Sequence, residues 1–320
     1  MARAAADNDR ALKARDVALL AVGCVVAAML VPVLPFVGVP VAALTLAWLT
    51  YEGRYPLAIG LAVLAAVVVA VSWQDPIFGP AVGVMLLLCG PLTARALEHQ
   101  KAGRVTVALA ATLGVGWAAL LIVAVVLSGQ SLGQIYAEFT SWMAASIRAA
   151  GGTAPEMTAV AQAVRAFVEI IPAALVVNAA LTAVLSVAAA TLAATWAGRV
   201  TNRLPRLAAM DLSIHVAWPA IVGLLLLAAS GFTHQSESWF SILGQNLLFV
   251  GRALLFVQGL AVFAGLYDKA KLGRIMRVSS FVLLVVTEML LPLVSLTGLA
   301  DLWLNIRRLP RDGAPATEES

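Results

Sequence analysis

The sequence predicts an all-α protein, a polytopic bundle of transmembrane helices. Hydrophobic residues make up 62% of the 320 residues and charged residues only 12%, whereas about a quarter of an ordinary soluble domain is charged. Several uncharged stretches reach roughly 18 to 25 residues, the length that an α-helix needs to cross a hydrocarbon core of about 30 Å. These stretches are continuous and do not alternate between polar and apolar residues, so spanning β-strands are excluded.

The first half of the chain is expected to hold five spans within residues 17–127, after a basic cytoplasmic N-terminus over residues 1–16. Pro32, Pro35 and Pro40 predict a tight turn between the first two spans. Arg95 and Arg104 belong to a basic loop, which the positive-inside tendency places in the cytoplasm. The five spans are predicted at residues 17–35, 38–51, 57–73, 77–97 and 105–127.

Residues 128–165 are too polar to cross a membrane and are predicted to form an amphipathic segment on the extracytoplasmic side. Apolar side chains recur there at helical spacing, which favours a helix that lies on a surface. Gly151 and Gly152 end this helix, and residues 153–165 are expected to form a second, short one. The recurring apolar residues are Leu132, Ile135, Phe139, Met143 and Ile147.

The second half is expected to add the remaining spans within residues 166–308, for a total of about eight or nine. A straight final span over residues 279–304 would place the following arginines outside, against the positive-inside tendency. A hairpin or surface-lying end hinged near Pro292 and Gly298 is therefore preferred. Residues 309–320 are predicted to be a disordered tail. The other spans are predicted at residues 166–196, 212–230 and 242–266.

Two ionic residues, Arg252 and Glu288, lie near the middle of consecutive apolar segments. An unpaired charge at the bilayer centre costs about 2.5 to 3.5 kcal/mol on insertion scales. Counted from the loop between the two segments, their depths differ by only about 7 Å at helical rise, which an arginine side chain can bridge. We therefore expect a pair, which is either a structural ion pair between two helices or a ligand or proton site.

Four more polar residues are candidates for a site. Asn178, with Thr182 on the same helix face, either meets the Arg252 pair or makes interhelical hydrogen bonds. Asn246 and Gln258 share a predicted span with Arg252 but point elsewhere, so a fully polar pore is not supported. Asp211 follows a proline-containing turn and is expected to be a helix N-cap or an ion partner of a nearby arginine. The nearby arginines are Arg203 and Arg206. Separately, Asp301 with Arg307 is interpreted as an anchor at the membrane interface.

The sequence does not favour an enzyme, a metal site or a cofactor. Cys24 and Cys89 lie inside apolar runs without metal-ligand spacing. The G-x-S-x-G match at residues 129–133 follows a predicted transmembrane helix, whereas a nucleophile elbow requires a preceding strand. There is no phosphate-binding G-x-x-x-x-G-K-[ST] motif, so an ATP-driven process would need a separate ATPase chain. The basic residues sit at the ends of apolar spans, which indicates membrane orientation and not nucleic-acid binding.

Several short motifs in the final third carry a resemblance to a known family. They are L-P-x-L-x-x-M-D-L at 204–212, N-L-L-F-V at 246–250, Gln258-Gly259-Leu260, and G-L-A-D-L-W at 298–303 followed by Arg307-Arg308. With these motifs the chain resembles the YybS-like bacterial membrane proteins, the family known as DUF2232. That family is grouped with the substrate-binding S subunits of energy-coupling-factor vitamin transporters. The resemblance implies a membrane-protein partner and separate ATPase subunits.

The resulting expectation is a multi-pass protein of the bacterial inner membrane, in contact with the lipid bilayer and with a cytoplasmic N-terminus. It binds a small ligand or works as a transporter-associated component. The alternative is a non-transporting scaffold, assembly or regulatory factor. A pocket lined by Arg252, Glu288, Asn178 or Asn246 would favour ligand binding, and a solid core would favour the scaffold.

Overall fold

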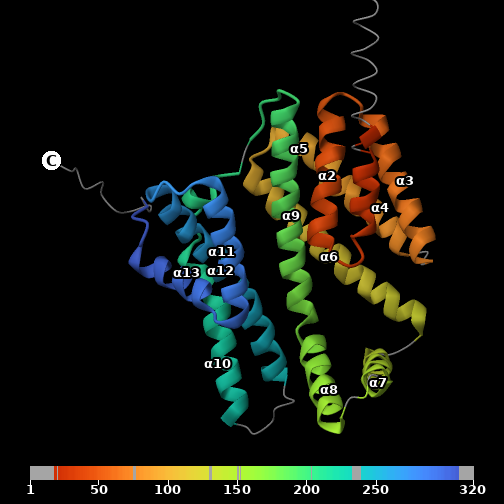
Figure 1. Cartoon of the computed structure of the whole chain (residues 1–320), viewed down its shortest axis with the longest axis vertical. Coiled ribbons are helices and arrows are strands. Elements are labelled where there is room, and N and C mark those ends of the chain that lie inside the picture. The colour runs from red at the N-terminus through yellow and green to blue at the C-terminus, as the bar shows by residue number, and fades with distance from the viewer. Residues whose placement is uncertain are drawn as a thin grey trace, which may run out of the picture. The chain divides into compact units, whose positions relative to one another are not determined.

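The computed structural model describes residues 18–309, with gaps at residues 20, 75–76, 130–131, 150, 152, 203 and 233–238. Within this part every regular element is a helix (Figure 1), which confirms the all-α prediction. The chain divides into two compact units, unit 1 with Met1–Ser131 and Leu175–Leu204, and unit 2 with Leu132–Ala174 and Pro205–Ser320. The predicted N-terminal segment and tail lie outside the described residues, as do Arg203 and the side chains of Leu132, Ile135 and Phe139.

Unit 1 begins with a helical segment at residues 21–29. A π-helical turn at Leu88–Leu92 interrupts the fourth predicted span at Pro91, which has no N–H for a regular helical bond. The remaining helices are α2 Pro35–Tyr51, α3 Tyr55–Trp73, α4 Phe78–Leu87, α5 Thr93–His99, α6 Ala102–Ser128 and, from Leu175 onward, α9 Ile171–Trp196.

Small residues let helices of unit 1 approach closely. A Cβ added at Gly83 of α4 would lie 2.9 Å from the Cβ of Ala66 on α3. A Cβ at Gly90 would lie 2.6 Å from that of Leu46 on α2. Such close approach of helix backbones is typical of membrane helix packing, where dispersion contacts replace the hydrophobic driving force.

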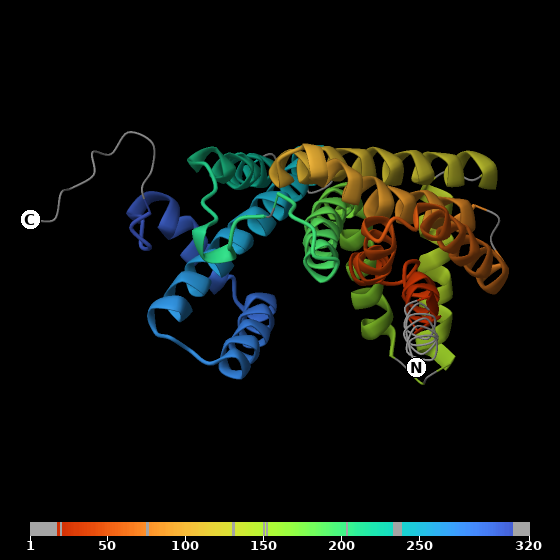
Figure 2. The same cartoon turned by 90° about the horizontal axis from the view of Figure 1, so that it is seen from above.

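Unit 2 is arranged around α11 (Trp239–Lys269), which contacts α10 (Trp218–Phe232) and α13 (Leu293–Leu304) extensively. Seen from above, α10 and α12 (Arg274–Leu290) lie on different sides of α11 (Figure 2). Two short 3₁₀ segments, η2 Leu207–Ala209 and η3 Ile214–Ala217, precede α10. The unit also contains α7 Leu132–Ala149, α8 Ala154–Glu169 and the first residues of α9.

Two helices, α7 and α8, form within the predicted amphipathic segment. Thr153 and Glu156 form a capping box at the start of α8, in which the main-chain N–H of Thr153 donates to Glu156 Oε2 at 2.6 Å. The helix α8 continues to Glu169, so the sixth predicted span begins at Ile171 and not at residue 166. The placement of this segment outside the membrane stays a prediction.

Six helices within the described residues are long and apolar enough to cross a membrane, and the bent pair of α12 and α13 makes up to seven. The expected count of eight or nine is not confirmed. The second predicted span corresponds to α2, which has 17 residues and counts only as a short apolar helix. The six are Tyr55–Trp73, Phe78–His99, Ala102–Ser128, Ile171–Trp196, Ile214–Gly231 and Trp239–Lys269.

Pro40 and Gly298 lie inside helices and not at the turn and the hinge where they were expected. Pro40 was expected in a turn but lies inside α2, which begins at Pro35 after a turn at residues 30–33. Proline suits the first helical position, because the N–H that it lacks has no helical partner there. The predicted hinge of the last segment is confirmed at Pro292, where the helices bend by 100°. Gly298, also expected at the hinge, lies within α13.

Candidate functional site

The predicted pairing of Arg252 with Glu288 is confirmed. Nε of Arg252 on α11 donates to Oε1 of Glu288 on α12 at 2.9 Å, and Nη2 of Arg252 donates to the main-chain oxygen of Glu288. The side chain of Arg252 is 46% exposed, whereas that of Glu288 is 10% exposed. The pair therefore joins a nearly buried carboxylate to a guanidinium with an open side.

The carboxylate of Glu288 also binds the first turn of α13. Its Oε2 accepts hydrogen bonds from the main-chain N–H groups of Val294 at 3.0 Å and Ser295 at 3.1 Å. The hydroxyl of Ser295 lies 2.6 Å from Oε1. Glu288 therefore acts as an N-terminal cap for α13 and satisfies donors that have no partner within that helix. Ser295 was not among the residues predicted from the sequence, although a polar residue three positions after the helix-breaking Pro292 was an available signal.

Two glycines allow α13 to lie directly on α11. A Cβ added at Gly259 would overlap the main chain of Val294, and one at Gly298 would overlap the main chain of Leu255. The absence of both side chains brings the two backbones together. Because the two backbones are close, Ser295 Oγ also lies 3.2 Å from the main-chain oxygen of Arg252. Ser295 therefore connects the crossing of α11 and α13 to the ion pair of Arg252 with Glu288.

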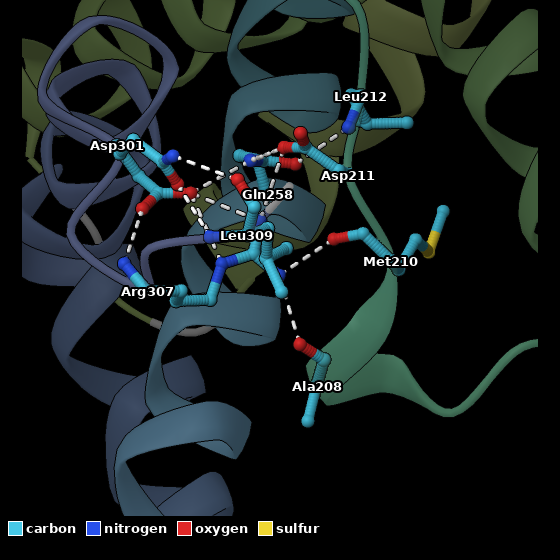
Figure 3. Close-up of polar contacts among 9 residues, drawn as sticks. Ala208, Met210, Asp211, Leu212, Gln258, Asp301, Arg307 and Leu309 are labelled. Atoms are coloured by element: carbon cyan, nitrogen blue, oxygen red, sulfur yellow. Dashed lines mark hydrogen bonds and ion pairs between the residues drawn. The ribbon is translucent and has the colours of Figure 1, made fainter. Parts of the chain in front are cut away.

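A second buried ionic group centres on Arg307 (Figure 3). Its side chain is 3% exposed, and Nη2 contacts Asp301 Oδ2 at 2.9 Å and Asp211 Oδ1 at 3.2 Å. Nη1 donates to the main-chain oxygens of Met210 at 2.6 Å and Ala208 at 3.1 Å. A buried guanidinium is tolerated only where such partners offset its loss of hydration. We call Asp211, Gln258, Asp301 and Arg307 the Arg307 cluster.

Gln258 completes the Arg307 cluster and is fully buried. Its Nε2 donates to Asp211 Oδ1 at 3.0 Å and to Asp301 Oδ2 at 2.9 Å, while Oε1 accepts from the main-chain N–H of Leu212 at 3.1 Å. Asp211 and Gln258 were predicted as separate candidates, and Asp301 with Arg307 was expected only as an interface anchor. All four residues lie in or beside the shared motifs, which was the signal that could have grouped them.

The expectation that Asp211 is a helix N-cap was wrong. It lies in a non-helical segment, and the residue that caps η3 is Ser213, whose Oγ accepts from the main-chain N–H of His215 at 3.4 Å. The expected ionic partners were Arg203, which lies outside the described residues, and Arg206, whereas the structure pairs Asp211 with Arg307. The non-helical segment over residues 210–213 carries Asp211, whose carboxylate binds Arg307 (Figure 3).

Asn246 joins α11 to the junction of α8 and α9. Its Oδ1 accepts from the main-chain N–H of Ala173 at 2.9 Å, and Nδ2 donates to the main-chain oxygen of Glu169 at 2.7 Å. The amide therefore replaces helical hydrogen bonds where the chain breaks around Ile170. Asn178 is half-buried on the unit 1 part of α9, and its role at a site stays a prediction. The hydroxyl of Thr182 is buried without a hydrogen-bond partner among the described residues.

These features define the chain as an integral membrane protein of several helices, whose C-terminal unit is held by buried ionic contacts. The chain belongs to the family described as "Predicted membrane protein (DUF2232)", whose model matches residues 18–302. This match confirms the resemblance and includes Asp211, Gln258, Glu288 and Asp301. No curated protein and no solved structure matches the chain.

Proposed function

We propose that the protein binds a small anionic ligand within the membrane through Arg252, as a component of a transport assembly. The observation that carries this proposal is the open side of Arg252 near the middle of the long apolar helix α11. A guanidinium has five N–H donors. Within the described part of the chain its Nε and Nη2 bind Glu288, and Nη1 has no hydrogen-bond partner.

The surroundings of Arg252 suit a carboxylate or phosphate ligand. A charged group at this depth requires water or a counter-charge, because hydrocarbon solvates it poorly. Arginine binds carboxylates and phosphates through paired, charge-assisted hydrogen bonds. Glu288 fixes one edge of the guanidinium and leaves the other available. Broken helices such as α12 and α13 form substrate sites in many transporters, which supports the same proposal.

The partners form the second half of the proposal. By resemblance to S subunits, a further membrane protein and separate ATPase subunits would complete the assembly. The protein itself would then be a binding component and not an enzyme. We place it in the bacterial inner membrane with a cytoplasmic N-terminus, in agreement with the basic residues at its span ends.

Native mass spectrometry on protein purified in lipid nanodiscs tests the ligand. The wild-type protein should carry a bound small anion that the Arg252→Gln variant loses. Arg165→Gln is a matched control, because Arg165 is also half-exposed and paired with a glutamate, Glu169, at 3.1 Å. A bound mass that survives Arg252→Gln, or that disappears equally from Arg165→Gln, would contradict the proposal.

A scaffold or assembly factor is the second candidate, and one observation favours it. The candidate polar side chains form hydrogen bonds within the protein itself. This holds for Glu288, Asn246, Gln258 and Asp211. Three cavities among the described residues, of about 450 and 390 Å³ in unit 1 and about 380 Å³ in unit 2, are lined by residues other than Arg252, Glu288, Asn178 and Asn246. Purification in mild detergent distinguishes the two, because a transport component should retain an ATPase and a scaffold should retain other proteins.

A further inference from the structure

Unit 2 contains a cavity of about 380 Å³ between η2, the end of α11 and the first turns of α12. Its polar lining is formed by Arg206, Asp268 and Arg277, and its apolar lining includes Leu207, Ala264 and Phe281. The cavity shares no residue with the Arg252 pair. Its polar and apolar sides therefore define a separate, amphipathic site.

Positive charge exceeds negative charge in this cavity. Nη1 of Arg277 pairs with Asp268 Oδ1 at 2.7 Å, and Nη2 donates to the main-chain oxygen of Leu272 at 3.4 Å. Arg206 has no ion pair among the residues that the structure describes. One carboxylate thus faces two guanidinium groups. The resulting field attracts an anion.

The apolar side of the cavity is well defined. Phe281 is positioned by an edge contact with the ring of Tyr267, at 5.4 Å between centroids and 75° between planes. Ala264 lies on the last turns of α11, a helix long enough to span the membrane and ending at Lys269. An amphipathic cavity at the end of a span lies at the level of the lipid headgroups, where basic residues contact anionic lipids.

We propose that this cavity binds the headgroup phosphate of an anionic phospholipid. Arg206 and Arg277 donate charge-assisted hydrogen bonds to the phosphate oxygens, a geometry that guanidinium groups suit. Leu207 and Phe281 contact the glycerol and the first acyl carbons. This apolar contact favours a lipid over a soluble phosphate, because a free phosphate has no part that would occupy it.

Lipid binding to the full-length protein in detergent micelles tests the proposal, with the thermal midpoint measured against added phosphatidylglycerol, phosphatidylcholine of the same chains, or inorganic phosphate. The work is done at high salt, since the Debye length falls to about 3 Å at 1 M and long-range attraction is screened. Phosphatidylglycerol should raise the midpoint more than phosphatidylcholine does, because the trimethylammonium group beside the phosphate of phosphatidylcholine is repelled by the two arginines at short range. Arg206→Gln combined with Arg277→Gln should weaken this binding at least about tenfold, since charge-assisted hydrogen bonds are lost.

A matched double variant, Lys269→Gln with Arg274→Gln, removes the same charge from exposed residues outside the cavity lining. It should bind phosphatidylglycerol like the wild type. Arg206→Gln alone should also weaken binding of phosphatidylglycerol. This single variant leaves the ion pair of Arg277 with Asp268 intact, so it tests the proposal even if the double variant folds poorly. Equal losses in the cavity and control variants would overturn the proposal, as would a full midpoint shift with inorganic phosphate alone.

Discussion

Ser295 binds both carboxylate oxygens of Glu288, Oε2 through its main-chain N–H at 3.1 Å and Oε1 through its hydroxyl at 2.6 Å. These two contacts cross the break where α12 and α13 bend by 100°. A break in an apolar environment exposes main-chain donors that lipid cannot satisfy. The Glu288 carboxylate supplies the missing acceptors, so the bend and the ionic pair with Arg252 stabilise each other.

Replacing Glu288 tests this arrangement. Glu288→Leu should reduce the free energy of unfolding by about 2 kcal/mol or more, because each unsatisfied buried donor costs about 1 to 3 kcal/mol. Arg252→Leu should cost less, since Arg252 is half-exposed. The double variant should be no less stable than Glu288→Leu alone, which a double-mutant cycle by denaturant unfolding in detergent measures. Strictly additive losses would show that the two residues act independently.

The crossing of α11 and α13 should be intolerant of a single methyl group. Gly259→Ala places a Cβ against the main chain of Val294, and overpacking of this kind costs about 1 to 3 kcal/mol. Gly60→Ala on α3 is the control, because its added Cβ has no neighbour within 4 Å. Thermal unfolding of both variants should show a lower midpoint only for Gly259→Ala. An unchanged Gly259→Ala would argue against the close crossing.

Replacing either of two neighbouring arginines, Arg307 and Arg308, should change the free energy of unfolding by very different amounts. Arg307→Met removes the guanidinium that pairs with the fully buried Asp301, and breaking a buried pair costs about 3 to 5 kcal/mol. Arg308→Met affects an exposed residue and should stay within about 0.5 kcal/mol of wild type. Denaturant unfolding compares the two variants. Similar stabilities would mean that Arg307 is not held as the Arg307 cluster describes.

Asn246 should protect the junction between α8 and α9 from amide hydrogen exchange. Asn246→Ala removes the acceptor of the Ala173 N–H, so amide hydrogen exchange at Ala173 should accelerate, about tenfold for each 1.4 kcal/mol lost. Gln245→Ala is the control, since Gln245 binds only Ser241 on its own helix, at 3.2 Å, among the described contacts. Equal exchange at Ala173 in both variants would contradict a local role for Asn246.

Much of the fold could be predicted from residues close in sequence. The break at Pro292 and the end of α7 at Ala149 follow from local chemistry, because proline and glycine disfavour continued helix, although Pro40 lies inside α2. The span count was harder to predict. The helix α2 has only 17 residues, and α12 and α13 meet at a bend of 100°, so neither is a straight span of full length.

The sequence by itself determined that this is a helical membrane protein and that Arg252 and Glu288 pair, because hydrocarbon excludes both long polar segments and lone charges. Only the tertiary structure decided that Glu288 caps α13 and that Arg307 joins Asp211, a residue 96 positions earlier. Helical periodicity relates residues a few positions apart, whereas these contacts depend on how separate helices cross. In unit 2 that crossing is set by the glycine contacts between α11 and α13.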